Sequence, residues 1–398
     1  MKIEQKAIKD LDISILDGDR GKNYPHQDEI FKAGYCLFLS ANNVTKKGFD
    51  FNETSYISKE KDETLRGGKI QRNDIIITTR GTVGNIAYYD DLIPYENIRI
   101  NSGMLIVRCG DKLNSKYIYY ALKNRWFQEQ IKSIQTGSAQ PQLPKSHFIQ
   151  MKLPVPSLNI QNRVANILWL LDQKINTNIR INDNLFEQME ALYRSCFVDY
   201  RPFGGSKPES WKQSDIYALA NIIYGAPFAS KQFNTEGVGK PIIRIRDLKE
   251  QKFTTYTTEV HPKGYLLQPG DIVVGMDGEF RPYIWGNDEA WLNQRVCVFA
   301  NKRPSGKAFL YFTIKPLLYA IEQTQVATTV IHIGKKDYDA FEVTLPNNEI
   351  LDKFDELTEP MIKRIVSNCF ENKRLENLRD ALLPKLMSGE IDVSAVQL

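Results

Sequence analysis

Basic and amide side chains gather in the loops of this sequence, at points where predicted strands end. Arginine can bind guanine through two hydrogen bonds, and glutamine or asparagine can bind adenine in the same way. Lysine, threonine and backbone amides hold phosphate groups. Each residue alone also fits a solvated turn, but together they predict contacts with nucleic acid. The candidates are Arg20, Lys22, Lys46, Lys47, Thr79, Arg80, Thr82, Gln140, Gln142, Lys145, Lys231, Arg244, Arg246, Arg281, Arg295, Lys335 and Lys336.

Motifs of catalysis are missing from the sequence. The nearest approach to a phosphate loop, GVGKP at 237–241, has the wrong spacing and lacks the Ser or Thr that would meet magnesium. Dinucleotide, zinc-protease and hydrolase motifs are absent, as are the NPPY-like tetrapeptide and glycine-rich loop of DNA methyltransferases. A nuclease cluster has no fixed spacing, and no candidate stands out. We therefore predict a non-catalytic chain without a metal site or cofactor; the isolated histidines are His26, His147, His261 and His332.

Composition indicates a folded chain with more than one core. It has 398 residues, 42% of them apolar and 25% charged. No apolar run reaches the 18 residues of a membrane span, and the N-terminus lacks an apolar signal region, which favours a cytoplasmic protein. Five scattered cysteines favour reduced thiols. The net charge of +4 is a weak signal, but its positive excess lies in 1–153 and 205–346.

Two halves of the chain follow one plan. A turn and a β-branched run, typical of a buried strand, occur at 73–77 and again at 270–274. Three further pairs of segments correspond at offsets near 192 residues, so little is inserted or deleted between them. These pairs are 101–104 with 293–296, 117–122 with 309–314, and 152–156 with 343–347.

Each half ends in a long helical pattern whose seam residues alternate in steps of four and three, as in a coiled coil. Polar residues occupy the middle of both seams, so antiparallel pairing would let them hydrogen-bond one another. We expect Asn159 and Asn348 to be N-caps, Gly389 to follow the second helix, and Pro360 to kink or break it. The predicted seam is Leu168, Leu171, Ile175, Asn178, Asn182, Leu185, Phe354, Leu357, Met361, Arg364, Asn368 and Leu375.

The predicted fold is therefore α+β with a pseudo-twofold internal repeat. Two globular mixed α/β domains are each followed by a long helix, and the helices pair as an antiparallel coiled coil. Such a pair would be a rigid spacer that holds two similar domains at a fixed distance. The expected divisions are 1–153 for the first domain, 154–204 for its helix and linker, 205–346 for the second domain, and 347–398 for the second helix and tail.

Several segments resemble the specificity (S) subunit of type I restriction–modification enzymes, in that family's order along nearly the whole chain. They are ILDGDRGKNYP (15–25), YCLFLSANNV (35–44), NDIIITTRGTVGN (73–85), LPVPSLNIQNRVANILWLLDQKI (153–175), IIRIRDL (242–248) and ALLPKLMSGEID (381–392).

The resemblance implies two target recognition domains that each read one half of a split target in double-stranded DNA. It also implies a host-defence complex in which the chain is inactive alone. Two modification subunits would carry S-adenosylmethionine and methylate adenine, and restriction subunits would use ATP and magnesium. The helices and nearby domain surfaces would dock the modification subunits.

One loop departs from the resemblance. TTRGTVGN of the first domain becomes GMDGEFRPY in the second, with Asp277 and Glu279 where Thr and Arg stood, although Arg281 could substitute. This departure and the weak net charge keep open an alternative, a coiled-coil adaptor whose domains do not bind DNA. A free-standing methyltransferase or nuclease is disfavoured by the missing motifs. The sequence does not predict which bases are read or the spacer length.

Overall fold

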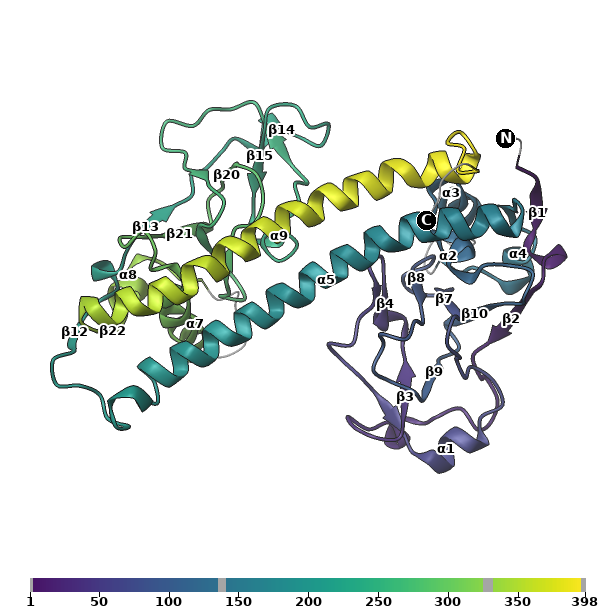
Figure 1. Cartoon of the computed structure of the whole chain (residues 1–398), viewed down its shortest axis with the longest axis horizontal. Helices are drawn as coiled ribbons and strands as arrows, with labels where there is room; N and C mark the ends of the chain where they lie inside the picture. The colour runs from purple at the N-terminus through teal and green to yellow at the C-terminus, as the bar shows by residue number, and fades with distance from the viewer. Residues whose placement is uncertain (1–2, 135–140, 325–331, 395–398) are drawn as a thin grey trace. The chain divides into compact units, whose positions relative to one another are not determined.

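The computed structural model describes residues 3–134, 141–324 and 332–394 (Figure 1). The chain forms two compact units, one of residues 1–173 with 376–398 and the other of residues 174–375. The candidate Gln140 lies outside the described residues.

The first unit is built around a four-stranded antiparallel sheet in the order β2-β10-β7-β8. Ile75 and Ile77 of β7 point into the core beneath α2 and α3, while Ile76 points into the core on the other face. The sheet is therefore buried on both sides, which explains the unbroken apolar run. The elements are β2 (Ile13–Asp17), β7 (Ile75–Thr78), β8 (Ile86–Tyr88), β10 (Met104–Cys109), α2 (Ser115–Lys123) and α3 (Arg125–Ile134).

A second, smaller sheet of this unit has the order β6-β3-β9, with β3 and β9 parallel. It covers the face of the larger sheet that carries Ile76, and it supports a short hairpin, β4 with β5. Strands β1 and β11 pair beside α4. The bounds are β1 (Gln5–Ala7), β3 (Cys36–Leu39), β4 (Val44–Thr45), β5 (Gly48–Phe49), β6 (Tyr56–Ile57), β9 (Ile98–Ile100), β11 (Lys152–Pro154), α1 (Lys59–Thr64) and α4 (Lys145–Phe148).

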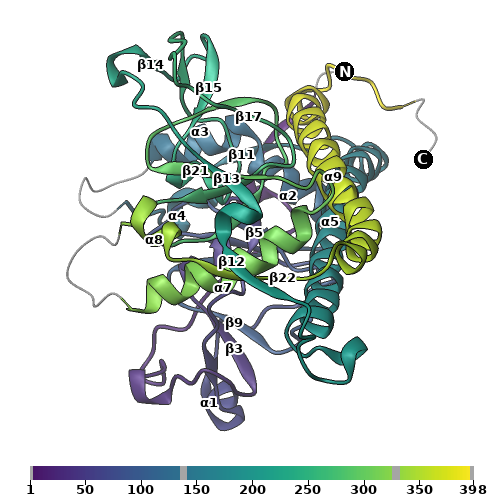
Figure 2. The same ribbon diagram turned by 90° about the vertical axis from the view of Figure 1, so that its left-hand side faces the viewer.

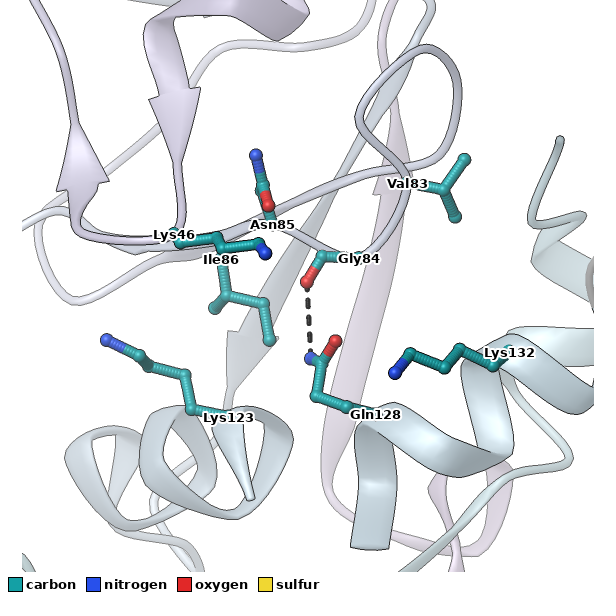
Figure 3. Close-up of a pocket in the computed structure, with 8 residues that line it drawn as sticks. All are labelled: Lys46, Val83, Gly84, Asn85, Ile86, Lys123, Gln128 and Lys132. Carbon is teal, nitrogen blue, oxygen red and sulfur yellow. Dashed lines mark hydrogen bonds between the residues drawn. The ribbon is translucent and has the colours of Figure 1, made fainter. Parts of the chain in front are cut away.

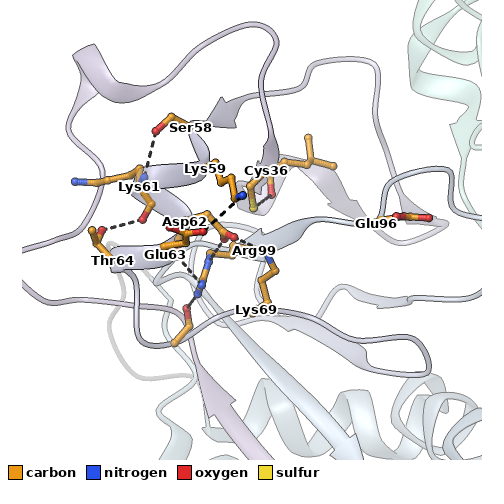
Figure 4. A network of polar contacts seen from close by, with 12 residues as sticks. Cys36, Ser58, Lys59, Lys61, Asp62, Glu63, Thr64, Lys69, Glu96 and Arg99 are labelled. Atoms are coloured by element: carbon orange, nitrogen blue, oxygen red, sulfur yellow. Dashed lines mark hydrogen bonds and ion pairs between the residues drawn. The ribbon is translucent and has the colours of Figure 1, made fainter.

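Buried charges join α1 to this smaller sheet (Figure 4). The Asp62 carboxylate accepts hydrogen bonds from Arg99 Nε and Lys69 Nζ, and Arg99 also donates to the Asp62 and Gly67 carbonyls. The Asp62 and Arg99 side chains are each 8% exposed. Burial raises the pKa of the neighbouring Cys36 thiol to about 12, so that thiol stays protonated and unreactive.

The second unit repeats the strand order of the first, and Figure 2 shows its elements from another side. Its four-stranded sheet, in the order β13-β21-β18-β19, has the strand pairing of β2-β10-β7-β8, and α7 takes the place of α2. Strands β12 and β22 pair as β1 and β11 do. The elements are β12 (Lys212–Asp215), β13 (Ala220–Tyr224), β18 (Ile272–Gly275), β19 (Pro282–Ile284), β21 (Val296–Asn301), β22 (Glu342–Leu345), α7 (Lys307–Thr324) and α8 (Lys335–Asp339). The predicted internal repeat is confirmed.

The smaller sheet of the second unit has five strands in the order β14-β16-β15-β20-β17. Its parallel pair, β15 with β20, corresponds to β3 with β9. The bounds are β14 (Phe233–Asn234), β15 (Lys240–Ile243), β16 (Tyr256–Thr257), β17 (Leu266–Leu267), β20 (Ala290–Leu292) and α6 (Ile245–Leu248). Single 3-10 turns span Ile8–Asp10, Gln27–Glu29, Ala41–Asn43, Arg201–Phe203, Ile216–Ala218 and Ser230–Gln232.

Two long helices, α5 (Leu158–Phe197) and α9 (Asn348–Ser388), contribute to both units. In the first unit, Asp172 of α5 pairs with Arg379 of α9 at 2.7 Å. In the second, Asn178 donates to Glu371 at 2.8 Å, and Asn368 donates to Asn182 at 2.8 Å. Partner numbers rise along α5 as they fall along α9, which confirms antiparallel pairing. The polar residues in the middle do bond one another, and they specify the register.

The burial of the predicted seam is uneven. Leu357 is 57% exposed and Arg364 is exposed, so the prediction is wrong for these two residues. The reason is that α9 also packs on the core of the second unit, which turns Leu351, Ile362 and Ile365 inward instead. Leu168, Ile175, Asn178, Phe354 and Asn368 are buried, while Leu171, Asn182, Leu185, Met361 and Leu375 are half-buried.

The predicted helix ends are shifted by a residue or two. Asn159 lies inside the first turn of α5, where its Oδ1 accepts from Arg163 Nε at 3.1 Å. Asn347 rather than Asn348 caps α9, because its Oδ1 accepts from the Ile350 amide. Helix α9 continues through Pro360, and Gly389 follows it in the left-handed conformation as expected. Among the described helices, none is both long and apolar enough to cross a membrane.

Candidate nucleic-acid interface

In the first unit, five predicted residues lie around β10 and the turn that precedes it. The amides of Thr79 and Arg80 both donate to the Gly103 carbonyl, at 2.7 and 3.2 Å. Arg80 also forms an isolated bridge with Gln142, from a segment more than sixty residues later. Arg20 and Lys145 come from the other side of β10. The Arg20 guanidinium donates to the Ser102 carbonyl at 3.3 Å, and Lys145 Nζ donates to the Ile15 carbonyl at 2.7 Å.

This cluster is basic and open to solvent. Asp17 is its one carboxylate contact among the described residues, lying 3.1 Å from Lys145 and 3.5 Å from Arg20. Arg80 is exposed and has no side-chain partner in the described part of the chain. A cation that no carboxylate neutralises is free to hold a phosphate or to read a base edge.

Of the other predicted residues in this unit, several are exposed and one is buried. Thr82 Oγ1 donates to the Ala41 carbonyl at 3.4 Å, which joins its loop to the segment leading into the β4–β5 hairpin. That hairpin carries Lys46 and Lys47 at its turn, and both are exposed, as is Lys22. Thr79 is only 5% exposed, so its side chain packs inside the loop.

In the second unit the corresponding position is acidic. Asp277 forms the isolated bridge with His332 that Arg80 forms with Gln142. The Asp277 carboxylate lies 2.6 Å from His332 Nδ1 and 3.6 Å from the Arg295 guanidinium. Arg295 has a positive φ of 72°, at the turn before β21. The second unit thus holds an Asp–His–Arg group where the first holds a free arginine.

The environment of Arg281 differs from that of Arg80. Its guanidinium forms a two-pronged ion pair with Glu322 of α7, with one N–O distance of 2.9 Å, and it lies over the Tyr319 ring. Hydrogen bonding from Arg281 lowers the pKa of Glu322, so the carboxylate stays charged and holds the arginine. Arg281 is therefore paired where Arg80 is not, and the sequence alone did not show this because Glu322 lies 41 residues away.

Arg244 is also a structural residue. Its side chain is 24% exposed, and it bonds Thr255 and lies 3.6 Å from the buried Asp247. Lys335 bonds Asp339 at 3.0 Å on α8. The predicted cations that are exposed in this unit are Lys231, Arg246, Arg295, Lys335 and Lys336.

Three residues near the first cluster escaped the sequence analysis. Lys123 of α2 and Gln128 and Lys132 of α3 line a hollow beside Lys46 and the loop at 83–86 (Figure 3). No motif marks them, since lysine and glutamine on a helix usually face solvent. Only the packing of α2 and α3 against the loop brings them to the candidate interface.

Comparison with known proteins identifies the family. The model of the Type I restriction modification DNA specificity domain matches residues 4–185 and again 208–366. The chain is 24% identical over 378 residues to the Type I restriction enzyme MjaIX specificity subunit of Methanocaldococcus jannaschii, covering 88% of this chain and 86% of that protein. It is 36% identical over 139 residues to the EcoBI specificity subunit of Escherichia coli, covering 35% and 29%.

The fold agrees with a crystal structure of the type I restriction–modification S subunit from M. genitalium. The TM-score is 0.57 at 16% identity, over 98% of this chain and 96% of that one. The family match falls on both units, so the chain carries two copies of a DNA specificity domain together with a pair of long helices. The chain belongs to the type I restriction–modification specificity family and is the DNA specificity subunit of such a system.

Specificity subunits are the non-catalytic members of these enzymes. S-adenosylmethionine and ATP bind to the modification and restriction subunits, with which the specificity subunit and DNA assemble. The expectation that the chain is a DNA specificity subunit is therefore confirmed, which favours it over the adaptor.

Replacing Arg80 with alanine is expected to weaken DNA binding by the assembled complex by about 1–3 kcal/mol and to relax base preference in one half of the target. Arg80 is an exposed, unpaired cation in the loop, so its loss should not disturb the fold. Arg125→Ala is the matched control, because Arg125 is 90% exposed on α3 and pairs with Glu129. Binding of target duplexes with single base changes measures both effects. Equal behaviour of the two variants would remove Arg80 from the interface.

Proposed function

We propose that each of the two units reads one half of a bipartite DNA target. The observation that carries this proposal is the duplication itself, since two family-model matches fall on two units with the same sheet order. One unit has a free arginine at the reading loop, and the other has an Asp–His–Arg group at the same position. Two similar scaffolds with different loop chemistry suit the recognition of two different half-sequences.

The divisions proposed for the chain are 1–153 and 205–346 for the reading domains, with 154–204 and 347–398 as spacer segments. The bounds of α5 and α9 support them, because both helices start within a few residues of the proposed limits. The exposed predicted cations of both units are the proposed DNA contacts. The protein works in the cytoplasm, where its target DNA and partners would be.

The spacer helices also offer a surface for the modification subunits. Leu170 and Ile179 of α5 and Leu357 and Leu378 of α9 are each 45–57% exposed. Large apolar side chains at this exposure are expected to be covered when the complex assembles. The helices would thus serve as spacer and docking platform together.

The proposal is tested by single-molecule methylation sequencing of DNA from cells that express the chain with its modification subunit. A split motif with N6-methyladenine in each half is the expected result. A continuous motif would contradict the two-domain reading. Absence of methylation from a complex shown to assemble would shift the assignment toward the adaptor.

A further inference from the structure

A basic hollow of about 350 Å³ opens beside the reading loop of the first unit (Figure 3). Lys46 approaches it from the turn between β4 and β5, Lys123 from the end of α2, and Lys132 from α3. Asn85 and Gln128 add amide groups to its wall. Three lysines from three different elements therefore surround one space.

Among the residues that the structure describes, no carboxylate lines this hollow. Lys123 Nζ donates to the Tyr119 hydroxyl at 3.0 Å, which leaves its charge uncompensated. Lys46 and Lys132 have no partner in the described part of the chain. The segment 135–140 that follows α3 contains no acidic residue. Like charges gathered around one space repel each other, so a bound anion would stabilise the arrangement.

In the second unit, the cations at the corresponding position are paired with carboxylates. Strand pairing puts Arg281 directly before β19, as Asn85 stands directly before β8. Glu322 accepts a hydrogen bond from the Phe280 amide at 3.3 Å. At the corresponding place in the first unit, Gln128 donates a hydrogen bond to the Gly84 carbonyl at 3.2 Å. Arg281 pairs with Glu322, and Lys315 of α7 pairs with Glu190 at 2.7 Å. The uncompensated charge is thus particular to the first unit.

We propose that this hollow binds a backbone phosphate of the DNA beside the half-site that the first unit reads. The inference rests on the proposed function and adds a positioning contact to it. The loop that carries Arg80 and Thr82 continues directly into the wall of the hollow at 83–86. A strand whose bases meet Arg80 would therefore pass a phosphate close to the three lysines. Lysine holds phosphate without reading sequence, so the contact would orient the duplex.

The test is the double variant Lys46→Gln/Lys132→Gln in the complex assembled with its partner subunits. Both side chains are exposed and have no partner among the described residues, so the fold should be retained. Affinity is measured against salt concentration on a duplex that carries the methylated motif and on one with both halves scrambled. We expect the slope of log K against log salt to fall by about 1. We expect the affinity loss, on the order of tenfold, to be equal on both duplexes.

Lys353→Gln is the matched control, since Lys353 is an exposed lysine of α9 paired with Glu349. An unchanged slope in the double variant, with the wild-type complex still methylating its motif, would overturn the phosphate site and leave the proposed function intact. Failure of the wild-type complex to bind or methylate would instead contradict the proposed function. A second measurement titrates the chain with inorganic phosphate. Loss of phosphate binding in the double variant without a change in DNA slope would overturn the DNA assignment in favour of a free phosphate-bearing ligand.

Discussion

A variant that lacks one heptad from each long helix, residues 173–179 of α5 and 371–377 of α9, is expected to methylate the same two half-sites at a spacing changed by about three base pairs. The chain passes between the two units only inside α5 and α9. Removing seven residues shortens each helix by roughly 10 Å and preserves a seam of period 3.5. The deleted segments face each other in the antiparallel pairing, and the Asn182–Asn368 bond remains.

Methylation sequencing measures the spacing directly. The control is the pair of substitutions Asn178→Ala and Glu371→Ala, which removes the hydrogen bond between these residues but keeps the helix length. It should leave the spacing unchanged. A heptad variant that retains the original spacing would show that the helices do not set it. A change of base preference within one half-site would contradict the separate reading of the two halves.

Asp62→Ala is expected to destabilise the smaller sheet of the first unit by about 3–5 kcal/mol. The substitution leaves Arg99 buried without its carboxylate partner and frees Lys69. Hydrogen exchange of amides in β3 and β9 is the suitable measurement, because two units need not unfold together. The control is Glu63→Ala on the same turn of α1, where the side chain is 66% exposed and pairs with Lys59 at 4.0 Å. Equal protection in both variants would show that the buried pair does not stabilise the sheet.

The same carboxylate predicts acid sensitivity of this sheet. Burial alone would raise the pKa of Asp62, but hydrogen bonds from Lys69 and Arg99 bring it below the ordinary value of 3.8. A lowered pKa in the folded state means that the ionised carboxylate stabilises the fold at neutral pH. This contribution is lost as the pH falls below 3.8 toward the folded-state pKa. Amides of β3 and β9 should lose protection over that range in the wild type, and Asp62→Ala should abolish this dependence.

The repeat and the helix pairing could be predicted because their signals are local. A β-branched run such as 75–77 needs no distant partner to indicate a buried strand, and heptad steps indicate a helix pair wherever it forms. The seam of α9 was less predictable. Helix α9 packs on both α5 and the core of the second unit. Its buried face is therefore divided between these two contacts, and Leu357 stays exposed.

The interface was only partly predictable because its chemistry depends on distant partners. Arg80 and Arg281 look alike in sequence, yet Glu322 holds Arg281, whereas no side chain in the described ranges pairs with Arg80. Lys46 of the basic hollow was a candidate from the sequence, but Lys123 and Lys132 lie on α2 and α3, and no spacing rule could place them beside it. Residue type predicted what a side chain could bind, while packing decided which side chains were free to do so.

The division of the chain also has a consequence for the order in which its parts can fold during synthesis. The core of the first unit includes Leu386, Met387 and Val393, and the carbonyl of Val393 accepts from Arg163 at 2.9 Å. A growing chain makes residues 1–173 first but must complete the whole of 174–375 before these residues emerge. Synthesis of the first unit therefore begins before that of the second unit but is completed after it. A chain cut after Leu375 would retain every residue of the second unit and would leave the first unit open.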